Sequence, residues 1–209
     1  MRFLSALEAR VLGVLVEKQA TVPDTYPLSL NALVAGCNQK TARDPVVNAS
    51  DADVLTAIDG LKSLSLVFEG SGSRVVKFEH NTARVLGVPS QSVALLATLM
   101  LRGPQTAAEL RLNCERLHRF ADVSSVEGFL DELAAKEPPR VARLARAPGA
   151  RESRWAHLLC GDAPHVQHTS DGPAATPSQW EQLEARVAAL EAQVAALMRS
   201  GANASGGAE

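Results

Sequence analysis

The stretch from residue 50 to residue 79 constrains the fold more than any other part of the chain. Ser50, followed three residues later by Asp53, is typical of a capped helix start. The pattern then changes from helical spacing to the alternation of two β-strands, at residues 66–69 and 74–79, joined by glycine and serine. The apolar stripe of the predicted helix is Val54, Leu55, Ile58, Leu61 and Leu64. The sequence therefore predicts a helix followed by a two-stranded hairpin.

Two further helices precede this unit, and the same order of elements recurs later. The first helix opens with the capping box of Ser5 and Glu8, and the second begins near Ser29. In the second half the signals are Ser90 or Ser92, then Thr106, then Ser124 with Glu127, then strands at 141–144 and 154–159. Three helices and a hairpin make a winged helix. We therefore expect a mainly α protein with small β-hairpins (α+β), in which two tandem winged-helix domains pack together because each is small.

A change of pattern near residue 161 separates these domains from the rest of the chain. Residues 178–199 repeat apolar side chains every three and four positions, and valine at a with leucine at d favours a parallel two-stranded coiled coil. We expect a homodimer through this helix, with packing on its own chain as the alternative. Its predicted seam is Leu183, Val187, Leu190, Val194 and Leu197. The predicted parts are 1–80 and 84–161 (winged helices), 162–177 (flexible linker), 178–199 (coiled coil) and 200–209 (disordered tail).

Composition and motifs point away from chemistry. The chain of 209 residues has a net charge of -2, so a nucleic-acid site must be a local patch. No apolar run approaches the roughly 18 residues that span a bilayer, and no signal sequence is recognisable, so we expect a cytoplasmic protein without membrane contact. Three scattered cysteines, Cys37, Cys114 and Cys160, fit neither a disulfide framework nor a zinc site. Phosphate-loop, zinc-protease and nucleophile-elbow motifs are missing, so we expect no enzyme, no cofactor and no metal.

The densest group of cations lies in the second predicted hairpin: Arg143, Arg146, Arg151 and Arg154. Guanidinium groups on a wing suit bidentate contact with phosphate. Alternatively, these arginines pair with nearby acids, namely Glu127, Asp131, Glu132 and Glu137. A second basic segment is the loop at residues 38–45, where Lys40 and Arg43 are either contact residues or simply solvated.

The third helix of each predicted domain is acidic and carries few side chains that read base edges. Two hypotheses follow. In the first, the protein binds double-stranded DNA with low sequence specificity, through Lys40, Arg43, Arg143, Arg146, Arg151 and Arg154. In the second, the paired domains form an adaptor for a protein partner and bind no nucleic acid.

Several longer motifs resemble the bacterial YceH family. They are Tyr26-Pro27-Leu28-Ser29, Cys37-Asn38-Gln39-Lys40, Arg43-Asp44-Pro45-Val46, Arg102-Gly103-Pro104-Gln105-Thr106, Glu109-Leu110-Arg111, and Pro148-Gly149 with Arg151-Glu152-Ser153-Arg154. The resemblance covers about residues 4 to 161 and implies two tandem winged helices. It implies no activity and no site residues, because that family has no assigned function. Ala42, Ala108 and Trp155 depart from the family's usual residues.

Overall fold

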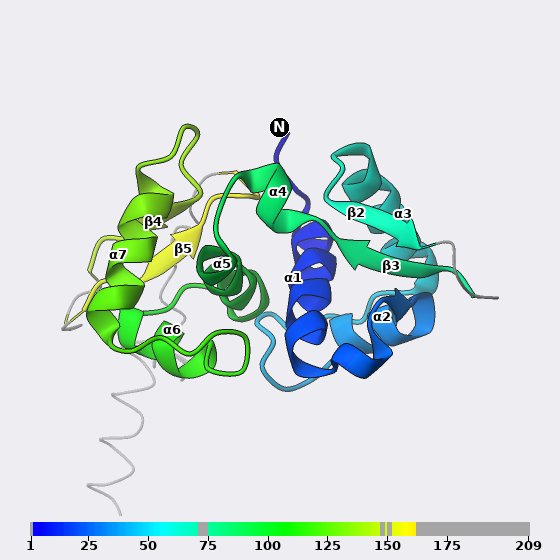
Figure 1. The fold of residues 1–209 in the computed structure, drawn as a ribbon, viewed down its shortest axis with the longest axis horizontal. Coiled ribbons are helices and arrows are strands. Elements are labelled where there is room, and N and C mark those ends of the chain that lie inside the picture. Colours follow the sequence, from blue (N-terminus) through cyan, green and yellow to red (C-terminus); the bar gives the residue numbers. More distant parts are fainter. Residues whose placement is uncertain (1, 71–74, 147–148, 150–151, 162–209) are drawn as a thin grey trace, which may run out of the picture. The chain divides into compact units, whose positions relative to one another are not determined.

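The computed structural model describes residues 2–70, 75–146, 149 and 152–161, all within one unit of the chain, residues 1–165. It is a mixed α and β structure with small antiparallel sheets, as expected (Figure 1). The first half comprises α1 (Ala6–Thr21), the 3-10 turn η1 (Pro23–Thr25), β1 (Leu28–Ser29), α2 (Leu30–Cys37), α3 (Asp51–Ser63), β2 (Val67–Gly70) and β3 (Lys77–His80). After α4 (Thr82–Leu86), the second half comprises α5 (Ser90–Arg102), α6 (Ala107–Asn113), α7 (Val123–Ala134), β4 (Val141–Arg143) and β5 (Trp155–His157).

The two halves share the order of their main elements, three helices followed by a hairpin. In the first, the sheet order is β1–β3–β2, so the short strand before α2 pairs with the return strand of the hairpin, with Leu28 opposite Phe78. In the second, β4 pairs with β5, and Gln105, just before α6, forms a bridge with Trp155 of β5. The predicted recurrence of three helices and a hairpin is therefore confirmed within the described residues.

The halves are joined along α1 and α5, which lie side by side between the two hairpins (Figure 1). Their buried side chains belong to one continuous hydrophobic core. Gly13 of α1 marks a close approach, because a Cβ atom there would lie 3.0 Å from Leu101 Cγ. Two backbone hydrogen bonds add to this seam, from Leu4 N–H to Leu159 O and from Asp44 N–H to Leu101 O, both at 2.8 Å. The expectation that the halves pack together is confirmed.

Local signals predicted most helix starts, with two exceptions. Capping boxes are present at Ser5, Ser50 and Thr106. The box predicted at Ser124 is wrong: α7 begins at Val123, and the carboxylate of Asp122 accepts the Ser125 N–H at 2.7 Å. At α5, residue 89 precedes the helix and no side chain caps it.

One member of the predicted stripe on α3 is misplaced. Leu55 is 41% exposed, whereas Val54 and Ile58 are buried. Successive helical residues are rotated by about 100° around the axis, so Leu55 cannot share the inward direction of Val54. The buried face instead uses Ala57.

Candidate functional site

The second hairpin presents fewer free cations than its sequence suggests. Arg154 donates to Pro104 O at 2.8 Å and pairs with Glu109 at 3.0 Å. The guanidinium carbon of Arg143 lies 5.8 Å from the centre of the Trp155 ring, which fixes an exposed charge over an aromatic face. Arg146 is exposed, and Arg151 lies outside the described residues. In the described part of the chain Arg143, Arg146 and Arg154 are therefore all exposed, and Arg154 is the one of the three that forms an ion pair.

Arg43 is an internal structural residue and not a solvent-facing cation. Its guanidinium makes a two-point contact with Glu17, at 2.6 and 3.1 Å, and also donates to the carbonyl of Gly36. The Arg43 side chain is only 1% exposed. Burial alone would raise the pKa of Glu17, but the hydrogen bonds and charge of Arg43 outweigh it, and the pKa is lowered. The predicted phosphate contact through Arg43 therefore has no accessible group, whereas Lys40 is exposed.

The loop that carries Lys40 meets the second half at a cleft of about 220 Å³. Lys18 of α1 lines it from the first half, and Arg102 and Arg116 line it from the second. Among the described lining residues the one carboxylate is Glu17, which Arg43 contacts at 2.6 Å and Lys18 at 3.5 Å. We call this the inter-half cleft; none of the hairpin arginines lines it.

Few local features of the sequence indicate this cleft. Arg102 stood out only as part of the helix-ending Arg102-Gly103-Pro104 motif, and Arg116 only as one of several cations before α7. Their convergence with Lys18 depends on the packing of α1 against α5, which no local motif encodes. Neither arginine forms an ion pair within the described residues, so both charges are available to an external anion.

The exposed faces of the two third helices carry the opposite charge. On α3, Asp51 and Asp59 are exposed, and on α7 Glu127, Asp131 and Glu132 are exposed. None of the acids on α7 pairs with the hairpin arginines in the described structure, so the alternative pairing proposed from the sequence does not form there. Acids on this face repel a phosphate backbone.

Other site classes can be assessed within the same residues. All three cysteines are free, with Cys37 and Cys114 buried. Burial raises the pKa of Cys37 to about 11, which leaves it protonated and weakly reactive. Across the described ranges no cluster of three or more His, Cys, Asp or Glu residues could hold a metal. None of the helices in those ranges has both the length and the hydropathy to cross a bilayer. The predicted dimer seam from Leu183 to Leu197 lies outside the described residues.

Comparison with known proteins defines the family. A family model described as "Protein of unknown function, DUF480" matches residues 4–150. The chain belongs to the DUF480 family. DUF480 relatives include a UPF0502 protein of Burkholderia pseudomallei, 68% identical over 200 residues, covering 94% of this chain and 86% of the relative. A UPF0502 protein of Leptothrix cholodnii is 69% identical over 192 residues, which cover 92% of this chain and 86% of the relative.

A UPF0502 protein of Cupriavidus taiwanensis is 67% identical over 203 residues, which cover 94% of this chain and 84% of the relative. Membership of a family without an assigned function, expected from the motifs, is therefore confirmed. The comparisons attach the designations DUF480 and UPF0502 to it and do not attach the name YceH. The DUF480 and UPF0502 designations state no activity.

Proposed function

We propose that the protein is a tandem winged-helix module that binds the backbone of double-stranded DNA with low sequence specificity. The winged-helix assignment is supported by the element order of each half and by the pairing of a short segment before the second helix with the return strand. The observation that carries the DNA proposal is the inter-half cleft, where Lys18, Arg102 and Arg116 converge from both halves.

Charge placement supports backbone contact and low specificity together. Exposed Lys40 follows Gln39, which lines the cleft, and exposed Arg143 and Arg146 add charge on the hairpin. Arginine suits bidentate contact with phosphate oxygens, and such contacts carry no sequence information by themselves. The acidic faces of α3 and α7 disfavour insertion of either third helix into a groove, which removes the usual source of base readout. The proposal assigns the protein no catalytic role.

The test is a titration of labelled mixed-sequence duplex with the full chain, followed by fluorescence anisotropy at several salt concentrations. We expect binding that weakens steeply between about 50 and 200 mM salt, because counterion release drives backbone contact. Replacing Arg102 and Arg116 together by alanine should lower the slope of log K against log salt by about 1 per lost phosphate contact.

The matched control is Arg84→Ala, which removes an exposed arginine of α4 that does not line the cleft. It should leave the slope unchanged. Failure to bind at the lowest salt, or equal slopes for the cleft variant and the control, would overturn the DNA proposal.

A protein-adaptor function is the second candidate, and the acidic outer faces of α3 and α7 favour it. Exposed Leu55 lies on α3 between the acids, which gives that face an apolar centre with a charged rim. A partner would then be a basic protein. A variant in which Glu127, Asp131 and Glu132 are all replaced by lysine discriminates the two proposed functions. If the protein is an adaptor, the variant loses its stoichiometric partner. If it binds DNA, the variant gains affinity for the duplex.

A further inference from the structure

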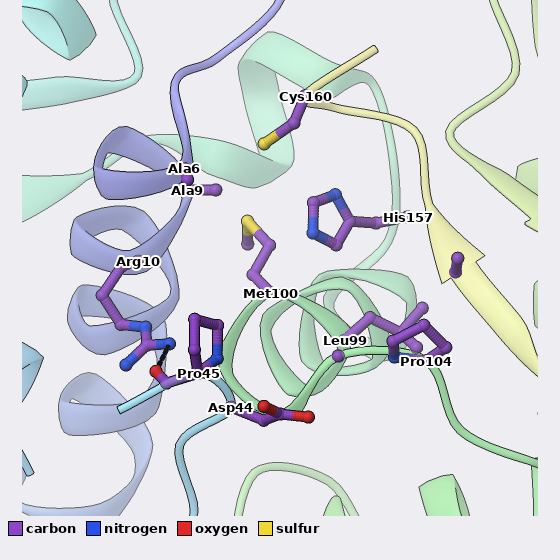
Figure 2. Close-up of a pocket in the computed structure, with 12 residues that line it drawn as sticks. Ala6, Ala9, Arg10, Asp44, Pro45, Leu99, Met100, Pro104, His157 and Cys160 are labelled. Atoms are coloured by element: carbon purple, nitrogen blue, oxygen red, sulfur yellow. Dashed lines mark hydrogen bonds between the residues drawn. The ribbon is translucent and has the colours of Figure 1, made fainter. Parts of the chain in front are cut away.

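A second cavity lies between the halves and differs in chemistry from the inter-half cleft. It has a volume of about 360 Å³ and is walled by α1, the loop before α3, α5 and β5. Most of the wall is apolar, with Leu99 and Met100 of α5 facing Ala9 of α1 and Pro104 (Figure 2). Its volume falls within the range of about 300–1,000 Å³ that is usual for small-molecule sites. Figure 2 shows the His157 ring of β5 directed toward α1 across this space.

Two buried polar groups in the wall lack partners. Arg10 is 4% exposed, and its guanidinium donates to Cys37 O at 3.3 Å and to Pro45 O at 2.7 Å. The Nε atom of Arg10 is buried without a hydrogen-bond partner, and so is Nδ1 of His157. A buried donor without an acceptor has lost its hydrogen bond to water without a replacement, so a ligand that accepts from Arg10 Nε restores that bond.

Among the described residues no carboxylate bonds directly to Arg10, although the charge of Asp44 in the same wall acts on it favourably. Arg10 forms no ion pair among these residues, and the nearby charge of Arg43, itself bound to Glu17, opposes its positive charge. Burial, followed by the charge of Arg43, lowers the pKa of Arg10. His157 is held neutral, since burial lowers its pKa to about 4. Asp44 lines the cavity from the loop and Cys160 lines it beside the N-terminal end of α1, where burial raises the thiol pKa.

We infer that this cavity binds a small carboxylate with an apolar body. The carboxylate accepts from the free side of the Arg10 guanidinium, which carries five N–H donors and uses two of its nitrogens on backbone carbonyls. The apolar body lies against Leu99 and Met100. Two classes of ligand have this chemistry, α-amino acids and simple carboxylic acids. The α-amino group of an amino acid would pair with Asp44, whereas a simple carboxylic acid has no cation for that carboxylate. This site does not rest on DNA binding.

The test uses the full chain, with calorimetry and thermal shift as readouts. The probes are leucine and phenylalanine, their deaminated counterparts 4-methylpentanoate and 3-phenylpropanoate, and the neutral amides of those two acids. We expect a carboxylate to bind and raise the melting temperature, because a ligand that binds only the native state stabilises it. The amides should bind at least about tenfold more weakly, since they lose the charge-assisted hydrogen bonds. Preference for the amino acids would identify Asp44 as a second contact.

Two variants locate the site. Ala6 is exposed and lines the cavity, so Ala6→Phe should block it and abolish binding. Its matched control is Ala52→Phe, an exposed alanine in the first turn of α3 that does not line the cavity; it should bind normally. Arg10→Gln should weaken binding of the carboxylates and leave that of the amides unchanged, with circular dichroism reporting whether the fold is retained. The inference is overturned if no carboxylate binds, if amides bind equally well, or if Ala6→Phe binds like its control.

Discussion

The Arg43–Glu17 pair illustrates how a charged residue changes role between sequence and structure. In the sequence, Arg43 is one cation in a polar loop; in the structure it is buried and bonded to a carboxylate 26 positions earlier. Nothing local to residues 38–45 indicates that partner, because the contact exists only after the loop folds against α1. Arg154 likewise donates a hydrogen bond to the carboxylate of Glu109, 45 positions earlier in the sequence. Long-range pairing therefore buries Arg43, whereas Arg154 stays exposed with a carboxylate beside it.

Removing one partner of the Arg43–Glu17 pair should be costly. Arg43→Ala leaves the largely buried Glu17 carboxylate with Lys18, at 3.5 Å, as its one remaining ion-pair partner in the described structure. We expect a loss of about 3 kcal/mol in the free energy of unfolding. Urea denaturation monitored by circular dichroism measures it. Lys40→Ala, three positions earlier and exposed, should change stability by less than about 0.5 kcal/mol. Similar effects for the two variants would show that Arg43 is not an internal structural residue.

His80 should make stability depend on pH. Its Nε2 lies 2.8 Å from Gln19 Oε1, and its Nδ1 accepts from Thr82 N–H at 3.4 Å, so the ring is bound as a neutral imidazole. Burial lowers the pKa of His80 to about 4. Below pH 6.5 the unfolded chain therefore takes up a proton that the folded chain refuses, and stability falls as the pH drops from about 6.5 to 4.

For a half-buried ring we expect His80 to contribute about 2 kcal/mol to that fall. Urea denaturation at pH 7 and pH 4.5 measures it, with His80→Gln expected to show a smaller difference between the two pH values. The wild-type fall also contains His157, whose pKa is lowered to about 4 as well, so the variant should retain part of it. An unchanged difference in the variant would rule out His80 as a contributor.

At the scale of elements, Ser50 and Ser124 have similar sequence surroundings, but only the first of the two caps a helix. Ser50 accepts the Asp53 N–H at 3.2 Å at the start of α3. Ser124 lies inside α7, after the Asp122 cap. Ser50→Ala should therefore cost about 1 kcal/mol and Ser124→Ala close to nothing, as measured by thermal denaturation. Equal costs would mean that helix α7 uses Ser124 after all.

The elements themselves were largely predictable, because caps and apolar periodicity are local. The order of helices and hairpins and most helix starts follow from residues a few positions apart. The short helix α4 was not predicted, since its five residues offer too few turns for a periodic signal. Helix α6 ends at Asn113, and Phe120 is buried from the loop that follows, against Phe129. Neither cavity between the halves could be predicted, because each combines residues from elements distant in sequence.

At the scale of the whole described unit, the α1–α5 seam should make both halves unfold together. Gly13→Val adds atoms where even a Cβ would approach Leu101 Cγ to 3.0 Å, and we expect a loss of about 1–3 kcal/mol from overpacking. The transition should be followed through Trp155 in a Trp180→Phe background, because Trp155 reports on the second half while Gly13 belongs to the first.

The control is Gly128→Val on α7, where an added Cβ meets nothing within 4 Å, so stability should change little. A Trp155 transition that is unmoved by Gly13→Val, while hydrogen exchange shows α2 and α3 opening earlier, would establish two independent folding units.

The hydrogen bond from Leu4 N–H to Leu159 O has a consequence for synthesis on the ribosome. Ser5 and Cys160, which meet beside this bond, are separated by 155 positions. At about 5–20 residues per second, the start of α1 waits on the order of ten seconds for this neighbour to be translated. Until α5 emerges, one side of α1 remains open to water. A nascent chain stalled before α5 is thus a natural client for a chaperone.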